Sequence, residues 1–456
     1  MKKNKTAIVI ITYNNLDYTI NCIESIKKYT KKNTYEIIII DNMSTDGTRE
    51  WLKNQSDLKV IMNDYNLGFP KGCNQGIEVA NADFDILLLN NDTIVTTNWL
   101  NNLKKCLYSS NEIGAVGAVS NHDENLQGVD FAYDNFDTMQ ELAKNNNISN
   151  KDKWEEKAFL IGFCILIKRE VINKVKCLDE FFSPGYIDDN DLSLRIIKAG
   201  YKFMLCHDSF IHHYLGSAFR KDLNKFYPIL YKNREYFKLK WGFETFAFDE
   251  IKHASLRMLE EDKDKNLKIL ELESGIGITI LKIKDSYKKA EIHGIEENIK
   301  MADIAKKFAD VDVSSVGVFP QSLSENYYDY IIIGSILERI SNPNEFLQNI
   351  KKYLKDGGYV IGETHNLSNY NIILELLNDN WYFSKYNFPK TNTNYFTKND
   401  IANLFYVNNF KNPAFLHWFS LPNEEEIKKI NELGKIVGDD KISLYKTHYY
   451  SFKFQK

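Results

Sequence analysis

The sequence contains few cysteines and no long apolar segment. Its six cysteines are scattered without a CxxC pair, and none follows Cys206, so neither a disulfide framework nor a zinc cluster is expected. The longest strongly apolar run, Ala158 to Ile167, is too short to span a bilayer. The lysines before Ala7 precede no small-residue cleavage site, so no signal peptide is expected. The chain is therefore predicted to be cytoplasmic and to have no transmembrane segment.

An excess of basic charge is also missing. The formal net charge is -4 and the pI is near 6.2, which removes any global argument for nucleic-acid binding. We predict no nucleic-acid partner. At 456 residues the chain is too long for one ordinary core. Its 28 Phe, 27 Tyr and 43% hydrophobic content are sufficient for two or more packed domains.

Three short apolar segments near the amino terminus are typical of buried strands. They span Ala7 to Ile11, Glu36 to Ile40 and Asp85 to Leu89. Each stops at a polar group, and these groups span Thr12 to Asn15, Asp41 to Gly47 and Asn90 to Thr93. Runs of β-branched residues separated by helical segments predict a parallel sheet, which binds ligands beyond the carboxyl ends of its strands. We therefore predict an α/β domain with one crevice where the polar groups meet.

The chemistry of these groups suits a nucleoside diphosphate sugar. A carboxylate at Asp41 is suited to accept a hydrogen bond from a base N–H. Asp92 is suited to hold a divalent cation, which stabilises the charge on a departing diphosphate. Asn90 is placed to contact the ribose or a metal-bound water without adding charge.

A run of carboxylates lies just before a predicted helix further along the chain. One of Asp188, Asp189 and Asp191 is expected to deprotonate an acceptor hydroxyl during in-line attack at the sugar carbon. Asp189 is our choice. Asp191 is interpreted as structural, either capping the helix or pairing with Arg195 at i+4.

Two adjacent histidines, His212 and His213, are candidate ligands of the metal or the diphosphate, because neutral imidazole is a common ligand. Neighbouring residues on a strand face opposite ways, so only one of them is expected to reach the site. We favour His212.

These segments, in this order, resemble the family 2 inverting glycosyltransferases with the GT-A fold over residues 6 to 220. The matching segments are Ile10 to Asn14, Asp41 to Gly47, Asn66 to Gly76, Leu89 to Thr93, Asp188 to Arg195 and His212-His213. The resemblance implies that Thr12, Asn14, Asp41 and Asn66 line the nucleotide, that Asp92 binds the metal and that Asp189 is the base. The full predicted site adds Asp188 to the catalytic group, Tyr13, Ser44, Gly68, Asn74, Asn90 and Asn91 to the donor-binding group, and His212 and His213 to the metal ligands. Asn90 departs from the first Asp of the family's DxD motif.

The first domain is expected to end in an aromatic, basic helix that finishes at Trp241. Within the domain, the Asn-rich segment from Lys144 to Lys151 is expected to form an exposed loop near the acceptor side. The charge run from Glu260 to Asn266 has nothing to bury, so we place the domain boundary there. The predicted division is a GT-A domain over residues 1–245, a linker over 246–265 and a second domain over 266–456.

The second domain is predicted to be a further α/β unit with its own sheet. Its expected strands are Leu267 to Leu272, Ala290 to Ile295, Tyr330 to Ile333 and Tyr359 to Gly362. The first is followed by a glycine turn ending at Gly277, and Glu296 follows the second, where an acid is suited to bind ribose hydroxyls.

With the segments Tyr328 to Pro343 and Leu354 to Tyr359, this turn resembles class I S-adenosylmethionine-dependent methyltransferases over residues 266 to 415. That family implies a Rossmann-like fold and S-adenosylmethionine as cofactor. The departures lie where the ligand is expected: Glu273 replaces the first glycine of the turn, and Val318, Ser335, Arg339, Asn392 and Asn394 replace other family residues. Together they indicate a degenerate domain that keeps the fold without its chemistry.

The leading hypothesis is an inverting glycosyltransferase that uses Mn²⁺ or Mg²⁺. Its donor is expected to be of the UDP-N-acetylglucosamine or dTDP-rhamnose type, and its acceptor a hydroxyl on a bacterial surface glycan or a protein such as flagellin, as the resemblance implies. A bifunctional enzyme that also methylates the sugar is the alternative. A third hypothesis, from another class, is a non-catalytic scaffold that binds a glycan or protein through the aromatic residues between Tyr227 and Trp241.

Overall fold

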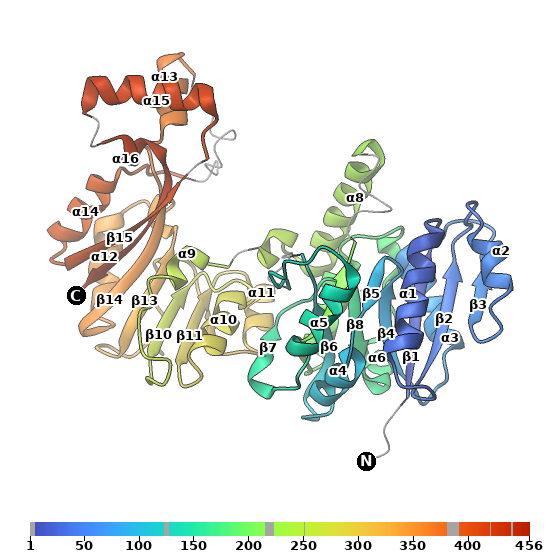
Figure 1. The fold of residues 1–456 in the computed structure, drawn as a ribbon. Coiled ribbons are helices and arrows are strands. Elements are labelled where there is room, and N and C mark those ends of the chain that lie inside the picture. Colours follow the sequence, from blue (N-terminus) through green and yellow to red (C-terminus); the bar gives the residue numbers. More distant parts are fainter. Residues whose placement is uncertain are drawn as a thin grey trace. The chain divides into compact units, whose positions relative to one another are not determined.

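A computed structural model describes residues 5–122, 127–214, 223–249, 251–380, 392–419, 421–438 and 441–456. The chain divides after Asp249 into two compact units. The first is coloured blue to green and the second yellow to red in Figure 1.

The first unit is built on a nine-stranded mixed sheet with the order β3-β2-β1-β4-β8-β6-β9-β5, and β7 pairs with β9. Its strands are β1 Thr6–Thr12, β2 Tyr35–Asp41, β3 Lys59–Met62, β4 Asp85–Asn90, β5 Thr93–Val95, β6 Ile113–Val119, β7 Trp154–Lys157, β8 Cys164–Ile167 and β9 Lys202–His213. β1, β2 and β4 run parallel as predicted, and the unpredicted β3 is parallel to β2, but β8 is antiparallel to both of its neighbours. An apolar run that is buried on both faces does not reveal strand direction, so the sequence could not predict this reversal.

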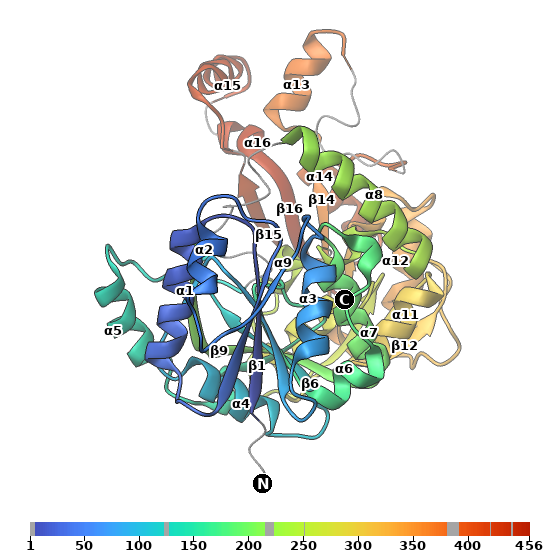
Figure 2. The same cartoon turned by 90° about the vertical axis from the view of Figure 1, so that its right-hand side faces the viewer.

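Helices cover both faces of this sheet. They are α1 Leu16–Tyr29, α2 Thr48–Lys53, α3 Phe69–Val79, α4 Trp99–Leu107, α5 Phe136–Asn146, α6 Arg169–Val175, α7 Asp188–Lys198 and α8 Leu223–Trp241. Figure 2 shows α1 and α4 on one side of the strands and α3, α6 and α7 on the other. Each side has its own apolar core, one with Ile23 and Leu103 and the other with Ile77 and Ile196.

The strand register brings the three predicted polar groups to one edge of the sheet. Thr12 at the end of β1 pairs with Asp41 at the end of β2, and Ile11 pairs with Asn90 at the end of β4. Because parallel strands in register end together, the segments that follow β1, β2 and β4 start side by side.

The Asn-rich segment is only partly the exposed loop that we expected, with Lys144, Ile148 and Lys151 exposed. It contains the end of α5, and Asn147 is only 1% exposed. The Asn147 amide donates to Thr96 Oγ1 (2.9 Å) and to the Thr97 carbonyl (2.8 Å), and its oxygen accepts from the Phe210 N–H (3.0 Å). The composition of the segment predicts a loop, but the side-chain amide of Asn147 is buried and provides a hydrogen-bond partner for a backbone N–H of β9.

Asp191 on α7 connects that helix to α8. Its fully buried carboxylate accepts from Arg195 Nε at 2.8 Å, as predicted for an i+4 pair, and from Trp241 Nε1 at 2.9 Å. Lys240 Nζ lies 2.6 Å from the same carboxylate. Asn233, also on α8, donates to the carbonyls of Phe182, Gly185 and Tyr186. α8 therefore holds both α7 and the loop that leads into it.

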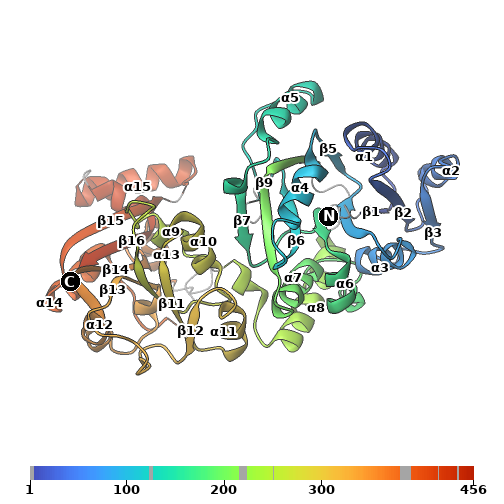
Figure 3. The same ribbon diagram turned by 90° about the horizontal axis from the view of Figure 1, so that it is seen from below.

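The second unit has a seven-stranded sheet with the order β12-β11-β10-β13-β14-β16-β15 (Figure 3). Its strands are β10 Lys268–Leu272, β11 Glu291–Glu296, β12 Asp310–Val313, β13 Tyr328–Gly334, β14 Leu354–His365, β15 Lys411–Phe419 and β16 Thr447–Gln455. The four predicted strands are all present. β12 and the antiparallel strands β15 and β16 were not predicted.

The helices of the second unit are α9 His253–Leu256, α10 Ile278–Ser286, α11 Ile299–Ala305, α12 Pro343–Lys351, α13 Tyr370–Leu377, α14 Lys398–Val407, α15 Glu424–Val437 and α16 Ile442–Lys446. α12 and α14 bury Leu347 and Phe405 in one core with Phe452 of β16. Among the helices described in either unit, none is both long and apolar enough to be a membrane span.

The division between the two units falls within the predicted linker over residues 246–265, after Asp249. Ala247 and Phe248 are buried in the first unit, while Met258 and Leu259 are buried in the second. In α9, the hydroxyl and N–H of Ser255 both donate to Glu363 on β14. The charge run from Glu260 marks a surface turn rather than the boundary, which lies about ten residues earlier, after Asp249.

Asp191→Ala is expected to destabilise the first unit by about 3 kcal/mol, because removing one partner of a buried ion pair leaves the other charges uncompensated. Guanidinium unfolding of wild type and variant measures the loss. The matched control is Glu78→Ala, at an exposed carboxylate of α3, with an expected change within about 0.5 kcal/mol. Equal stability of the two variants would contradict a supporting role for Asp191.

Candidate active site

The turns after β1 and β2 are bound to each other. The N–H of Asn14 donates to Ser44 Oγ at 2.7 Å, and Asn14 Oδ1 accepts from the N–H of Thr45 at 2.7 Å. Asn14 has a left-handed backbone, with φ of 59°, which asparagine tolerates better than most residues. The predicted residues Asn14 and Ser44 are therefore neighbours although they are thirty residues apart.

Asp41 lies beneath this pair of turns. Its side chain is fully buried, and its two oxygens accept from the Ser44 N–H at 3.3 and 3.2 Å. Arg49 Nε lies 3.6 Å away, a contact that the sequence analysis missed. Asp41 therefore shapes the turn that Ser44 belongs to, the common role of an Asp that follows a strand.

Asn91 and Thr12 form a second link across the strand ends. The Asn91 amide donates to Thr12 Oγ1 (3.3 Å) and to Thr19 Oγ1 (3.0 Å), and the two hydroxyls are 2.9 Å apart. Tyr13, between these turns, is 41% exposed. Tyr13 is therefore open to a ligand, whereas Thr12 is buried.

Asp92 and His213 lie together at the end of β9. Asp92 is 7% exposed, and its Oδ1 is 3.2 Å from His213 Nε2. The same nitrogen is 3.4 Å from Asn90 Nδ2. The ring of Phe163 stacks on His213 with centroids 5.2 Å apart. An imidazole, a carboxylate and an amide thus converge at this point.

His212, which we favoured, points to a different set of side chains. Its Nδ1 is 2.6 Å from the Tyr133 hydroxyl, and the rings of Phe136 and Tyr214 pack against it. Burial, followed by the charges of His122 and His213, lowers the pKa of His212 to about 4. Of the two histidines, His213 is the one that lies beside Asp92, because strand alternation turns His212 to the opposite face.

The end of β6 adds two residues that the sequence analysis missed. Asn121 Oδ1 accepts from the N–H of His213 at 2.8 Å, and its amide lies 3.0 Å from His122 Nε2. The ring of His122 meets that of His213 edge-on at 6.5 Å. The signal was available, since Ser120-Asn121-His122 follows an apolar strand in the same way as the other polar groups.

Asp189 is held in place by backbone N–H groups at the start of α7. Its Oδ2 accepts from Gly162 at 3.2 Å and its Oδ1 from Asn190 at 2.9 Å. The next carbonyl along from Gly162, that of Phe163, accepts from the Asn90 N–H at 2.9 Å. The Gly162-Phe163 segment therefore contacts both Asp189 and the Asn90 to Asp92 group.

Asp188 differs from Asp189 in its surroundings. It is 6% exposed. Burial, and to a smaller extent the neighbouring carboxylate of Asp189, raises the pKa of Asp188 to about 8. Two adjacent carboxyls with different environments are a common feature of acid and base sites.

The loop after β3 packs against the loop that leads to Asp188. Gly68 has φ of 80°, and a Cβ added to it would lie 2.3 Å from the Cα of Pro184. The exposed Asn66 closes this turn by accepting from the Gly68 N–H at 2.9 Å. Only glycine allows this close approach.

Asn74 does not join the donor-binding group. Its amide donates to the Leu178 carbonyl (2.9 Å) and to Glu180 Oε1 (3.0 Å), and its oxygen accepts from the Leu178 N–H (2.9 Å). Because its polar atoms are engaged by these partners, we assign Asn74 a structural role in fastening α3, which corrects the prediction.

The donor set at Asp92 fits a divalent cation. Mg²⁺ and Mn²⁺ are bound by one or two carboxylates together with substrate phosphates, and imidazole is an accepted ligand. Within the described ranges, no three His, Cys, Asp or Glu side chains gather as a ready-made metal site. Asp92 and His213 would therefore hold a cation together with diphosphate oxygens.

The glycine turn of the second unit does not fit S-adenosylmethionine. Glu273 takes a left-handed backbone (φ 51°) and its carboxylate forms an ion pair with Arg339. Glu296, the predicted ribose acid, accepts from the N–H groups of Gly275 and Asn298 at 2.8 Å each, and burial raises its pKa. The turn thus carries a side chain and an ion pair where the resemblance places a glycine.

Comparison with known families is consistent with this geometry. Residues 7–176 match the glycosyl transferase family 2 model, and residues 243–414 match a methyltransferase domain model. The chain carries a family 2 glycosyltransferase domain. It is followed by a methyltransferase-type domain, so the chain is α/β with a GT-A-like first unit and a Rossmann-like second unit.

Two curated relatives are glycosyltransferases. The chain is 26% identical to Glycosyltransferase GlyG of Streptococcus pneumoniae over 44% of its own length and 68% of that protein. It is 23% identical to Glycosyltransferase AglE of Haloferax volcanii, over 44% of its own length and 64% of that protein. A solved mannosyltransferase, PcManGT of Pyrobaculum calidifontis with GDP-Man and Mn²⁺, is 18% identical with a TM-score of 0.36, over 47% of this chain and 58% of that one.

Asp188→Asn is expected to remove a pH dependence of stability. The folded chain binds the Asp188 proton more tightly than the unfolded chain, so the stabilisation is complete below the ordinary aspartate pKa and is lost as the pH rises towards about 8. Melting temperatures at pH 5.5 and pH 8 should therefore favour the variant more at pH 8. The exposed Asp83→Asn serves as control, and an equal difference between Asp188→Asn and wild type at both pH values would refute the expectation.

Proposed function

We propose that the glycosyltransferase domain transfers a hexose from a nucleotide sugar to a hydroxyl group with inversion at the sugar carbon. The observation that carries this proposal is the Gly162-Phe163 segment, which contacts Asp189 through one N–H and Asn90 through one carbonyl. This segment therefore links the position of the Asp189 carboxylate to that of the Asn90 to Asp92 group, which is suited to a diphosphate.

In the proposed step, Asp189 removes the proton from the acceptor hydroxyl as its oxygen attacks the sugar carbon. The new C–O bond forms while the bond between the sugar carbon and the diphosphate oxygen breaks, and that oxygen leaves with the electron pair. A single displacement of this kind inverts the carbon. A charged base suits this role because two N–H groups fix Asp189, whereas the buried Asp188 keeps its proton at neutral pH.

Asp92 and His213 are proposed to hold the divalent cation, with Asn90 beside them. When bound, Mn²⁺ or Mg²⁺ neutralises charge on the diphosphate and so stabilises the leaving group. Asn121 holds the backbone of His213, because its Oδ1 accepts from the backbone N–H of His213. Such a hydrogen bond fixes the strand end that presents the imidazole.

The donor candidates are the UDP-N-acetylglucosamine and dTDP-rhamnose types. Asn14, Ser44 and Tyr13 are proposed to contact the nucleotide, since they lie at the adjoining ends of β1 and β2. A hydroxyl of a bacterial surface glycan or of a protein such as flagellin is the proposed acceptor. A panel of nucleotide sugars, tested for hydrolysis with and without each metal, identifies the donor.

The two alternatives have less support. A bifunctional enzyme requires S-adenosylmethionine at a turn where Glu273 and Arg339 form an ion pair. A purely binding scaffold through α8 is disfavoured because Phe237 and Trp241 are buried, although Tyr227 and Tyr231 are 47% and 61% exposed. Neither alternative gives a role to Asp189 or to the pair of Asp92 and His213.

Asp189→Asn is expected to lower kcat for sugar transfer by about 10²- to 10⁴-fold, the usual contribution of a general base. Donor KM should change little, because the base acts on the acceptor. Release of nucleoside diphosphate in the presence of acceptor measures both constants. The exposed Asp83→Asn, two residues before β4, is the matched control. An Asp189 variant with full transfer would exclude Asp189 as the base.

His213→Ala is expected to raise the Mn²⁺ concentration needed for half-maximal transfer by about tenfold, a typical cost of weakening a metal site. His212→Phe keeps a ring of similar size and should leave that concentration near the wild-type value. Metal titrations of the two variants make the comparison. A larger effect at His212 would reverse the assignment of the ligand.

A further inference from the structure

The strand ends at the centre of the second sheet are where an open α/β sheet binds its ligand. β10 lies between β11 and β13 and is parallel to both. In chain order, β11 and β12 are added on one side of β10, and β13 and β14 then follow on the other side. The topological switch point therefore lies between β10 and β13. A cofactor would enter beside the turn at residues 273–277.

A side chain of the protein already lies at this position. Lys252 Nζ is 3.0 Å from the Leu272 carbonyl, 2.7 Å from the Glu273 carbonyl and 2.6 Å from Glu271 Oε1. An ammonium group has three N–H donors, and these three acceptors satisfy them all. A ligand that brings its own ammonium to these carbonyl oxygens would have to displace Lys252.

The stem of Lys252 also closes the other side of the switch point. A Cβ added to Gly334, the last residue of β13, would lie 3.0 Å from Lys252 Cε. The side chain is only 14% exposed. Lys252 therefore passes between the ends of β10 and β13, and Gly334 leaves the room that it needs.

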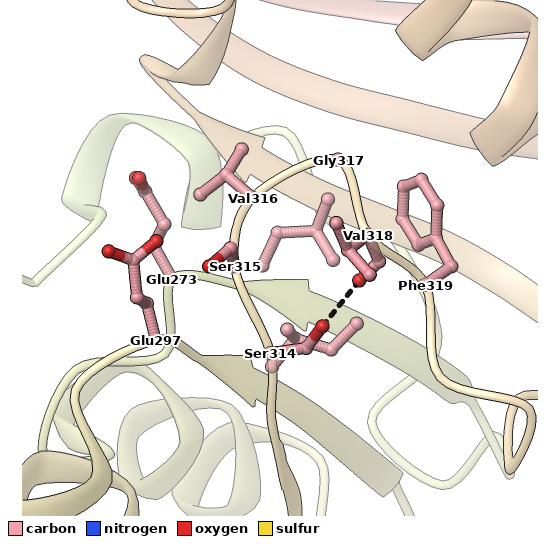
Figure 4. Close-up of a pocket in the computed structure, with 10 residues that line it drawn as sticks. Glu273, Glu297, Ser314, Ser315, Val316, Gly317, Val318 and Phe319 are labelled. Atoms are coloured by element: carbon pink, nitrogen blue, oxygen red, sulfur yellow. Dashed lines mark hydrogen bonds between the residues drawn. The ribbon is translucent and has the colours of Figure 1, made fainter.

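The space that remains beside the turn is small. The pocket beside Glu273 has room for about one water molecule. Figure 4 shows Glu273 and Glu297 on the same side of it and Phe319 on the opposite side. The Ser314 hydroxyl, which faces this space, already donates to the Val318 carbonyl at 2.7 Å.

We propose that Lys252 is a built-in cationic occupant of the strand-end site, and that the methyltransferase-type domain consequently does not bind S-adenosylmethionine. The ammonium satisfies backbone carbonyls that an amino-acid cofactor would otherwise use. It also neutralises Glu271, which is fully buried. The ion pair between Glu273 and Arg339 then joins the turn to the segment after β13.

This role differs from that of a simple counter-ion for Glu271. A counter-ion needs only the carboxylate, whereas Lys252 makes two further hydrogen bonds to the carbonyls that follow it. Removing the Lys252 ammonium should therefore leave the Glu271 carboxylate unpaired. Together with the two carbonyls, that carboxylate should then form a site for a small cation.

Equilibrium dialysis of the full chain against labelled S-adenosylmethionine tests the proposal independently of sugar transfer. Wild type should show no binding tighter than about 1 mM. Glu273→Gly, which restores the turn glycine but keeps Lys252, should also show none. Lys252→Ala combined with Glu273→Gly should gain binding.

Chemical rescue provides a second readout. Propylammonium contains the atoms that Lys252→Ala removes, so it should raise the melting temperature of that variant and leave wild type unchanged. If the variant does not fold alone, refolding with and without propylammonium gives the same comparison. Binding of S-adenosylmethionine by wild type or by Glu273→Gly overturns the proposal, as does a folded Lys252→Ala protein that propylammonium does not stabilise.

Discussion

The buried carboxylate of Asp191 is the contact on which the geometry of the glycosyltransferase site depends. A charge without solvent costs several kcal/mol unless it is paired and hydrogen-bonded, and Asp191 meets this condition only when Arg195, Lys240 and Trp241 are all in place. Arg195 in turn donates to the carbonyls of Val175, the last residue of α6, and of Cys177. One carboxylate thus fixes three helices, and the proposed base is two residues away on the same helical turn.

The rest of the site is positioned by short polar contacts between loops rather than by long side chains that reach in from a distance. Asn14 joins the ends of β1 and β2, and Asn91 joins the ends of β1 and β4. The Gly162-Phe163 segment joins the end of β4 to α7. Because each link uses a backbone group or a short side chain, little conformational freedom remains to be lost when a substrate binds. Such preorganisation suits a site that must align a hydroxyl with a sugar carbon.

The sequence predicted the features that depend on local pattern. The apolar runs located seven of the strands, and the polar groups after them located Asn14, Asn90 and Asp92. It failed where a distant contact decides the outcome. The choice between His212 and His213 depends on which face of β9 meets Asp92, the amide of Asn74 is engaged by Leu178, and Asn147 is buried because β9 needs its hydrogen bonds. The antiparallel direction of β8 and the place of α9 in the second unit also depend on tertiary packing that one sequence does not encode locally.

The close approach of Gly68 to Pro184 limits how this enzyme could be engineered. A library that diversifies the loop after β3 would lose members carrying a side chain at position 68, since a Cβ there would lie 2.3 Å from the Cα of Pro184. Tyr65, three residues earlier and 66% exposed, has no such restriction. Variation there leaves the contact between Gly68 and Pro184 unchanged.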